Sequence, residues 1–423
     1  MKASRVLYVF ALLAIVLASC GPAATTAAPT QPPAATMAPA ATSAPASGAP
    51  AACATDTYGC AKIAPGTTVK IGMGGPMTGD NASYGIDISQ GGQIAIKDGG
   101  DIDGWKFELV AQDDGGTAEG GAAVANKLVT DPSVVAIAGH IFSGATAAAI
   151  PIYDKAGLPM LSPSATNPDL TKPQTGLRVF NRIAYTDDVQ GKFSADYLFK
   201  KLNFTKIAIL HDGSTYGKGL ATIVQTDFVA DGGTVTSFDA ITTGAGDFTT
   251  PLAKVASGKP QALFFGGYTG DASVLVNEMA QSGLQGVVFF GDDGTYGAQF
   301  LTLGGKNAEG AYAVTLEPPS SPANDAFKAA YKAAYGKDPG VLSPYTWNGY
   351  DVVAALISVV KTVAIKGTDG NLYIPRGAMV TGVRTLKDYH GLSGTFTCDA
   401  TGECNSSGPI YVIVKNGAWA PAP

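Results

Sequence analysis

Short apolar segments recur along the chain, and each is followed by a longer stretch with helical character. The apolar segments are rich in β-branched and aromatic residues and occupy 69–72, 107–110, 134–138, 158–161, 206–210, 262–265 and 287–290. The helical stretches include 118–129 and 217–230. Continuous apolar strands that alternate with helices are typical of buried parallel sheets. The pattern therefore predicts an α/β protein built from two doubly wound parallel-sheet lobes.

The chain begins with the pattern of an export signal. Lys2 and Arg5 precede an apolar run over 6–18, which is too short to span a bilayer comfortably. The run ends in Leu-Ala-Ser-Cys, which resembles the lipobox of bacterial lipoproteins, so residues 1–20 are predicted to be a signal peptide ending at a lipidated Cys20. A plain secretory peptide with a chance cysteine is the alternative. Either reading predicts an exported protein, and a lipidated Cys20 would anchor it to the cell membrane.

Residues 21–66 consist almost entirely of Ala, Pro, Thr and Ser. Such a composition has too little apolar surface to offset the entropy of ordering the chain. We expect this segment to be a disordered tether, with the folded part starting near Thr67.

Charge and composition limit the function classes. The 423 residues carry a net charge of -6 with 15% charged residues, and no basic run follows the signal peptide, which disfavours nucleic-acid binding. The 46% hydrophobic content is ample for a core, and the length beyond the tether, about 350 residues, is enough for two lobes.

The cysteines form two local pairs beyond Cys20. Cys53 with Cys60 and Cys398 with Cys404 have the spacing of small disulfide loops, as expected in an oxidising compartment. Zinc ligation is the competing interpretation. Neither pair has C-x-x-C spacing and the three histidines are scattered, so no metal site and no cofactor are predicted.

The loops that follow the predicted strands are the places to look for a ligand site. In doubly wound sheets, ligands bind beyond the carboxyl ends of the strands. These loops span 74–79, 139–144, 162–166, 211–217, 266–268 and 291–294. They offer hydroxyls, exposed amides, aromatic rings and carboxylates, but no lysine or arginine.

This set of groups fits a zwitterion. A helix starting near Ser143 supplies free N–H groups for a carboxylate, and the hydroxyls of Ser143 and Thr166 add hydrogen bonds. Asp293 is the best-placed acceptor for an ammonium. The aromatic rings predicted to wall the apolar side chain are those of Tyr84, Tyr216, Tyr268 and Tyr345.

Each of these residues has a structural alternative. Ser143 fits equally well as a helix N-cap. Asp293 is followed by glycine, which is the commoner pattern of a turn. Tyrosines near strand ends more often pack than bind.

Several motifs together resemble a known family. The stretch 71–85 reads IGMGGPMTGDNASYG, and 162–170 reads SPSATNPDL. With VANKLV at 124–129, the His-Asp pair at 211–212, Tyr216-Gly217 and 308–310, these resemble the leucine/isoleucine/valine-binding proteins, which have the type I periplasmic-binding fold. The resemblance runs from Thr67 to near the C-terminus.

The resemblance implies a monomeric solute-binding protein that delivers a branched-chain or other neutral amino acid to an ABC permease, with no catalysis. It implies that Ser143 and Thr166 bind the ligand carboxylate, helped by main-chain groups around Ser164 and Ala165. Asp293 falls where the family commonly has a glutamate that holds the ammonium. The pocket-lining aromatic positions fall on Tyr84, Tyr216, Tyr268 and Tyr345.

Two departures from the family pattern stand out. Aspartate at 293 is one methylene shorter than glutamate, so the ammonium would sit deeper or be reached through water. The cysteine pair of some close relatives is absent, since Asp113-Asp114 is followed by Gly115-Gly116 and Phe142 occupies the other place.

The family architecture implies a three-strand hinge, with crossings near Tyr185, Glu317 and Leu392. The N-terminal lobe would then comprise 67–185 and 318–392, and the C-terminal lobe 186–317 and 393–423. A ligand that touches both lobes favours the closed form, which a permease can read.

Two other functions remain open at this point. A secreted hydrolase or nucleotide-dependent enzyme is disfavoured, because no G-x-S-x-G motif occurs and Met77 replaces the third glycine of a dinucleotide fingerprint that starts at Gly72. A ligand sensor of the same fold, binding an amide, urea or a related solute, is the closer alternative.

Overall fold

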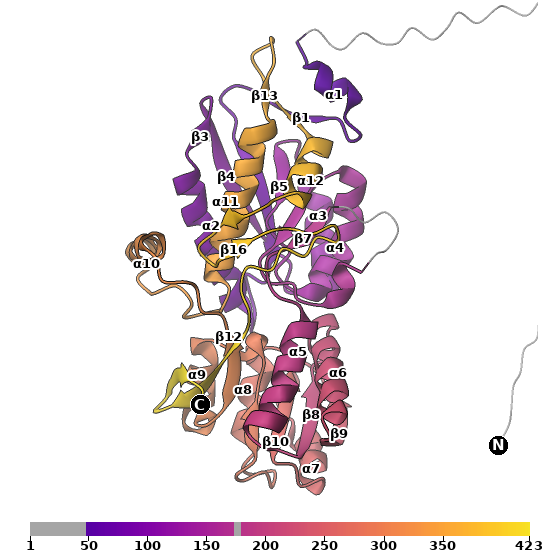
Figure 1. Ribbon diagram of the computed structural model, residues 1–423, viewed down its shortest axis with the longest axis vertical. Helices are drawn as coiled ribbons and strands as arrows, with labels where there is room; N and C mark the ends of the chain where they lie inside the picture. Colours follow the sequence, from indigo (N-terminus) through magenta and orange to yellow (C-terminus); the bar gives the residue numbers. More distant parts are fainter. Residues whose placement is uncertain (1–47, 173–178) are drawn as a thin grey trace, which may run out of the picture. The chain divides into compact units, whose positions relative to one another are not determined.

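Two β-sheets organise the chain, and each forms the centre of a lobe (Figure 1). The computed structural model describes residues 48–172 and 179–423, all within the unit formed by residues 45–423. The predicted signal peptide, the lipidation site Cys20 and the tether up to residue 47 lie outside the described residues. Within the described ranges, no helix is long and apolar enough to cross a membrane.

The first lobe contains a six-stranded sheet in the order β3-β4-β2-β5-β6-β7. Its strands are β2 (Val69–Gly75), β3 (Asp101–Ile102), β4 (Trp105–Asp113), β5 (Val134–Ile137), β6 (Met160–Ser162) and β7 (Phe180–Arg182). All neighbours run parallel except β3, which pairs antiparallel with β4 at the edge. The loops after β2, β5 and β6 therefore emerge at the same edge of the sheet.

Helices cover this sheet in two pairs. The helices of the lobe are α2 (Ala82–Gly99), α3 (Ala118–Leu128), α4 (Ser143–Ala156), α10 (Pro322–Tyr335), α11 (Thr346–Val363) and α12 (Arg376–Arg384). Helix α3 packs on α4, and α2 packs on α11. Helices α2 and α11 approach closely because Gly91 and Gly349 lie in their interface, where a Cβ on Gly91 would be 2.2 Å from the Thr346 carbonyl oxygen.

The second lobe contains a seven-stranded sheet in the order β18-β17-β12-β11-β10-β8-β9. Its strands are β8 (Lys206–His211), β9 (Thr234–Ala240), β10 (Ala262–Gly266), β11 (Val288–Phe290), β12 (Tyr312–Thr315), β17 (Ile410–Lys415) and β18 (Ala418–Pro421). Strands β8 to β12 run parallel to one another, and β17 and β18 add antiparallel strands at the edge beside β12. The helices are α5 (Asp187–Asp196), α6 (Thr215–Ala230), α7 (Thr249–Ser257), α8 (Thr269–Glu278) and α9 (Ala298–Gly304).

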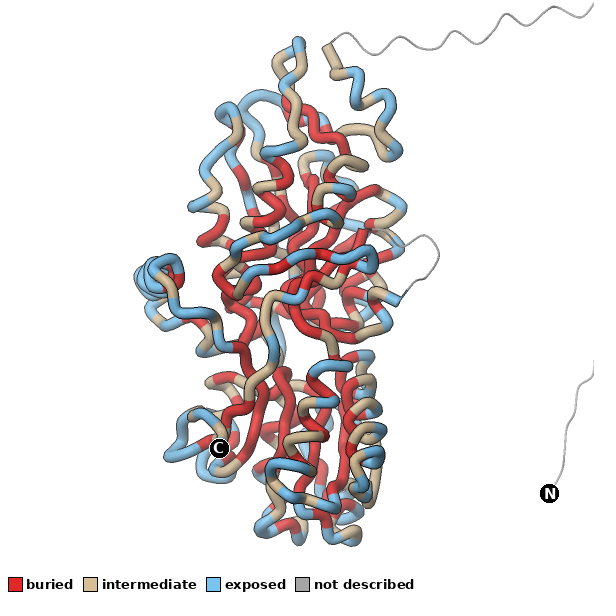
Figure 2. Tube along the Cα trace, in the orientation of Figure 1, coloured by how far each residue is buried: buried red, intermediate tan, exposed pale blue. Residues whose placement is uncertain are grey.

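Both faces of this second sheet are buried, which explains its continuous apolar strands. Successive side chains of a strand point to opposite faces. Ile207 and Ile209 of β8 belong to a cluster with Val224 of α6, whereas Leu210 belongs to a cluster with Leu252 of α7. In Figure 2 the buried residues accordingly follow the strands of both lobes. The predicted α/β class with two largely parallel sheets is confirmed.

Three segments connect the lobes. The first runs through 183–186 and the second through 316–321, around Tyr185 and Glu317. The third runs through 405–409, between the last contacts with the first lobe and β17, and not near Leu392 as expected. Residues 393–404 therefore stay with the first lobe, which corrects the predicted boundary.

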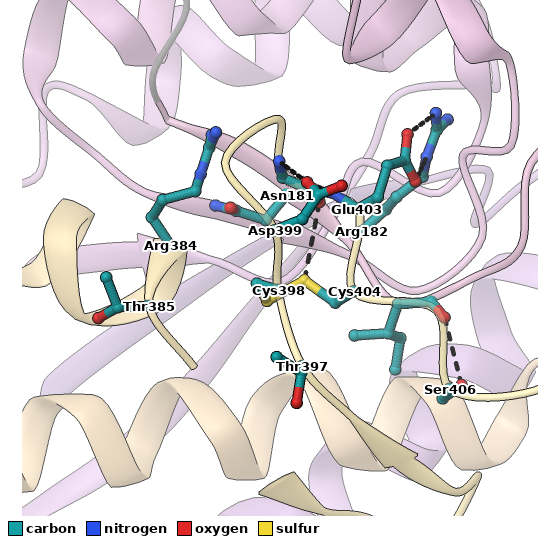
Figure 3. Close-up of a disulfide and its surroundings, with 12 residues drawn as sticks. Asn181, Arg182, Arg384, Thr385, Thr397, Cys398, Asp399, Glu403, Cys404 and Ser406 are labelled. Atoms are coloured by element: carbon teal, nitrogen blue, oxygen red, sulfur yellow. Dashed lines mark hydrogen bonds and ion pairs between the residues drawn. A yellow bond between two sulfur atoms is a disulfide. The ribbon is translucent and has the colours of Figure 1, made fainter. Parts of the chain in front are cut away.

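A disulfide hairpin explains the shift of the third connection. Cys398 and Cys404 form a disulfide, and the hairpin they close lies beside β7 (Figure 3). The Arg182 amide donates to the carbonyl of Gly402, and the Cys404 amide donates to the carbonyl of Arg182. The Arg182 guanidinium also pairs with Glu403 at 2.5 Å. These contacts extend the edge of the first sheet and hold the chain there until Ser406.

The end of the predicted tether is folded. Helix α1 (Ala51–Thr55) and strand β1 (Cys60–Ile63) are joined by the Cys53–Cys60 disulfide. Strand β1 pairs antiparallel with β14 (Leu372–Pro375), which also pairs with β13 (Ile365–Lys366). The boundary at residue 66 was therefore placed too late, because a cross-link and strand pairing supply the order that the Ala/Pro/Thr composition alone does not.

Asp56 fixes this N-terminal segment to the first lobe. Its carboxylate accepts hydrogen bonds from the amides of Gly377 at 2.8 Å and Ala378 at 3.2 Å, at the N-terminus of α12. A side chain from a distant segment thus satisfies amides that a helix start leaves without partners.

We expect Asp56→Ala to lower the free energy of unfolding by about 1 kcal/mol in urea denaturation, because the α12 amides lose their acceptor. Asp338→Ala is the control, since Asp338 only pairs with Lys332 where both side chains are 61% exposed. Its effect should stay below about 0.5 kcal/mol. Equal losses in the two variants would contradict the capping role of Asp56.

Candidate functional site

Loops from both sheets meet around a small cavity. It is lined by Tyr84, Phe142, Ser143, Ser164 and Tyr345 of the first lobe and by Tyr216, Tyr268, Asp293 and Gly294 of the second. Seven of the nine predicted ligand residues are in this lining. The rings leave a volume of about 10 Å³, roughly the space for one water molecule. An amino acid can therefore enter only when the lobes separate or the rings turn.

Asp293 is the centre of the contacts between the lobes. It begins a short 3-10 helix, η3 (Asp293–Thr295), in the loop that follows β11, and it is buried. Tyr216 of its own lobe donates to one carboxylate oxygen at 2.5 Å, and Tyr345 of the other lobe donates to the second at 2.7 Å. The Tyr84 hydroxyl donates to the main-chain carbonyl of Asp293. Both the side chain and the main chain of Asp293 therefore take part in contacts between the lobes, which a simple turn residue would not do.

The aromatic rings also join the lobes. Phe142 of the first lobe stacks on Tyr268 of the second, with centroids 4.0 Å apart and an angle of 12° between the planes. Tyr84 meets both rings edge-on, at 5.8 Å from Phe142 and 6.4 Å from Tyr268. In the sequence, Phe142 stands out only because it replaces a cysteine of some relatives, and no sequence pattern indicates that its ring reaches across the cleft.

Ser143 lies at the first turn of α4 and does not cap it. The residue before it, Phe142, is in the N-cap position, and no side chain caps this helix. The Ser143 hydroxyl oxygen accepts a hydrogen bond from the Asn167 amide at 3.2 Å, which leaves its own proton free to donate. The N–H groups and the positive end of the α4 dipole point toward the same space.

The loop after β6 supports the site from the first lobe. Ser164 lines the cavity, but Ala165 and Thr166 are not in the lining. The Ala165 amide donates to Ser162 at 3.0 Å, and its carbonyl accepts from Arg182 at 2.9 Å. The main chain of Ala165 is therefore engaged with the protein itself. Thr166 is buried, and its hydroxyl lies close to the carboxyl group of Asp187.

Two carboxyl groups that the sequence reasoning left out lie near the cavity. Asp292 is fully buried next to Asp293 and accepts from the Gly267 amide at 2.9 Å. Burial, followed by the charge of Asp293, raises the pKa of Asp292 well above its ordinary value. Burial also raises the pKa of Asp293, although hydrogen bonds from the hydroxyls of Tyr216 and Tyr345 act in the opposite direction.

Asp187 is the second of these groups. It is the first residue of α5, just after the first connection between the lobes, and it is buried. Burial raises its pKa to about 8, although the nearby Thr166 hydroxyl acts in the opposite direction. No strand-end rule pointed to Asp187, because it follows a connection rather than a strand.

The site and the fold together define the class of protein to which this chain belongs. Two lobes joined by three connections enclose a site that combines hydrogen-bond donors on one lobe with a carboxylate on the other, which is the arrangement of a two-lobed solute-binding protein. Among residues 48–172 and 179–423, no group of three or more His, Cys, Asp or Glu could hold a metal ion.

Comparison with known proteins gives the family. The family model described as periplasmic binding protein matches residues 68–418. This chain belongs to that family of binding proteins, and it is not an enzyme.

Individual relatives agree with this assignment. A leucine-specific-binding protein of Salmonella typhimurium is 34% identical over 297 residues, which cover 69% of this chain and 78% of that protein. An amino acid binding protein of Pseudomonas aeruginosa is 35% identical over 240 residues. That alignment covers 56% of this chain and 63% of the relative, so it spans less than two thirds of the relative's length.

A solved structure shows the same fold. The branched-chain amino acid transporter substrate binding protein of Streptococcus pneumoniae, in complex with isoleucine, superposes with a TM-score of 0.74 and 29% sequence identity. The match covers 83% of this chain and 97% of that one. The predicted type I periplasmic-binding fold is confirmed.

The hydrogen bond between Tyr345 and Asp293 is expected to help hold the lobes together. We expect Tyr345→Phe to weaken ligand binding about fivefold in calorimetric titration, because only the closed form makes this bond. The control is Tyr350→Phe, which removes a hydroxyl that donates to Asp98 within the first lobe at 2.9 Å. If both variants bind ligand equally well, the bond does not contribute to closure.

The pKa of Asp187 predicts a pH-dependent stability. Between its ordinary value near 4 and about 8, the folded chain holds a proton on Asp187 that the unfolded chain releases. The stabilising contribution is complete below about pH 4 and is lost as pH rises toward 8. Asp187→Asn cannot ionise, so its free energy of unfolding should fall less steeply, by at most about 1.4 kcal/mol per pH unit. Urea titrations of the ligand-free proteins at several pH values test this, and parallel curves would refute it.

Proposed function

We propose that this chain is the extracytoplasmic solute-binding protein of an ABC importer, which captures a branched-chain or other neutral amino acid between its lobes and delivers it to the permease. The chain belongs to the periplasmic binding protein family, and relatives named for leucine, isoleucine and valine support this ligand class. We also propose that Cys20 is lipidated and that the lipid holds the protein at the membrane.

Hydrogen-bond donors on one side of the cleft and an acceptor on the other support a zwitterionic ligand. The first lobe offers the free proton of Ser143 and the N-terminus of α4, both suited to a carboxylate. The second lobe offers the carboxylate of Asp293. A ligand with a carboxylate and an ammonium on one carbon can contact both sets only when the lobes close on it.

The lining favours a ligand that carries its own positive charge. None of the nine lining residues is a lysine or arginine. The nearby cation, Arg182, is fully buried, with its guanidinium bound to the carbonyls of Ala165 and Asn167 and to Glu403. A free carboxylic acid would therefore meet helix amides but no side-chain cation, whereas a zwitterion also brings an ammonium to the acidic lobe.

The aromatic rings of the cavity offer a surface for the apolar side chain of the ligand. Tyr84, Phe142 and Tyr268 surround one end of the cavity. Their faces can pack against an aliphatic side chain once the ligand separates them.

Calorimetric titration against a panel tests the proposal. The panel contains leucine, isoleucine, valine and alanine. It also contains two analogues of leucine: leucinamide, which lacks the carboxylate, and 4-methylpentanoate, which lacks the ammonium group. We expect the amino acids to bind and both analogues to bind at least tenfold more weakly, because each loses a charge-assisted hydrogen bond. Ser143→Ala should reduce the preference for leucine over leucinamide.

Two results would remove the proposal. One is the absence of binding by every amino acid of the panel, while an amide or urea binds. The other is an unchanged preference for leucine over leucinamide in Ser143→Ala. Ser133→Ala serves as the matched control, because Ser133 lies in the turn before β5 and not in the cavity lining.

A further inference from the structure

A second set of contacts joins the lobes outside the cavity. Gln299 of α9, in the second lobe, lies against the start of α2 in the first lobe. Its side-chain nitrogen donates to the main-chain carbonyl of Asp80 at 2.7 Å, and its side-chain oxygen accepts from the Ser83 hydroxyl at 3.1 Å. Asp80 is exposed, Ser83 and Gln299 are half-buried, and none of the three lines the cavity. One side chain therefore bridges the two lobes twice at the solvent-exposed edge of their interface.

The main chain before Gln299 also meets the first lobe. The Ala298 amide donates to the carbonyl of Val341 at 2.8 Å, in the segment between α10 and α11. Gly297 leaves room for this approach, because a Cβ there would lie 2.6 Å from the Leu342 carbonyl oxygen. The start of α9 is thus fitted to two separate segments of the first lobe.

A glycine of the second lobe gives clearance at the same edge. Gly270 lies in the first turn of α8 and is half-buried. A Cβ built on it would lie 3.0 Å from the Cβ of Asp80, which is closer than ordinary van der Waals contact. A larger residue at 270 would therefore hold the two lobes apart or displace the Asp80 loop.

We propose that Asp80, Ser83, Gly270 and Gln299 form a rim latch that helps to set the affinity for the ligand without touching it, with Gln299 as its positioning residue. The inference rests on the proposed function for the ligand, but not for the closing movement.

The effect of the rim latch follows from the population of the closed form. The hydrogen bonds of Gln299 exist only when the lobes are closed, so they favour that form whether or not a ligand is bound. A ligand that requires the closed form binds with an apparent affinity that is reduced by the fraction of chains in that form. Loss of the rim latch should therefore weaken the binding of every ligand by the same factor.

Calorimetric titrations with leucine, isoleucine and valine test this on the full chain. We expect Gln299→Ala to bind all three about fivefold more weakly, with their order of preference unchanged. Gln285→Ala is the matched control, because the Gln285 amide donates to the Ala280 carbonyl within the second lobe. It should bind all three like wild type. Unchanged affinity in Gln299→Ala, or clearly different factors for the three amino acids, would overturn the proposal.

A steric variant tests the same edge in a second way. Gly270→Leu should also weaken the binding of all three amino acids by a common factor, because the added side chain meets Asp80 only when the lobes close. It decides the question by the same criteria if Gln299→Ala does not fold.

Cross-linking measures closing without any ligand. The pair Asp80→Cys and Gly270→Cys brings two Cβ positions to 3.0 Å, and a small movement of the exposed Asp80 loop gives the roughly 3.5–4.5 Å of a disulfide. Because Gln299 bonds to the main chain at position 80, the pair keeps that bond. Cys20→Ser removes the remaining thiol, since the other four cysteines form disulfides.

The rate of cross-linking under a fixed oxidant should fall about fivefold when Gln299→Ala is added, and should not change when Gln285→Ala is added. Equal rates in the two would refute the rim latch. If wild type binds no amino acid, the proposed function fails, and the cross-linking rates still decide whether the rim latch exists. If wild type binds leucine and Gln299→Ala matches it, only the rim latch is refuted.

Discussion

The buried carboxylate of Asp293 is the interaction on which the closed arrangement of the lobes depends. Hydroxyls from both lobes donate to its two oxygens, and a third hydroxyl reaches its carbonyl. A buried carboxyl is costly unless it is hydrogen-bonded. Opening the lobes removes the hydrogen bonds from Tyr84 and Tyr345. The free energy of burying Asp293 therefore depends on whether the lobes are open or closed.

The rest of the molecule positions the partners of Asp293. Tyr345 precedes α11, which is held against α2 by the close contact at Gly91 and Gly349. Tyr216 lies in the first turn of α6, directly after the loop that follows β8. Because each tyrosine is fixed by a helix packed on a sheet, the site is assembled by rigid elements and the motion is left to the three connections.

Three buried acidic side chains, Asp187, Asp292 and Asp293, lie around the site. The two carboxylate oxygens of Asp293 accept the hydroxyls of Tyr216 and Tyr345, and Asp292 accepts the main-chain amide of Gly267. A zwitterionic ligand brings one positive and one negative group into a space with raised carboxyl pKa values, so binding, closure and proton release are expected to be linked. Such linkage makes affinity sensitive to pH near neutrality.

The sequence by itself determined the two parallel-sheet lobes, since continuous apolar strands and intervening helices are local patterns. It also indicated Ser143 and Asp293, which follow strand ends. It did not determine the end of the tether at Cys53–Cys60 or the late third connection, because both depend on pairing with distant strands. Only the tertiary structure placed Asp187 beside the loop after β6, since its position is set by the packing of α5 against that loop and not by any neighbour in the chain.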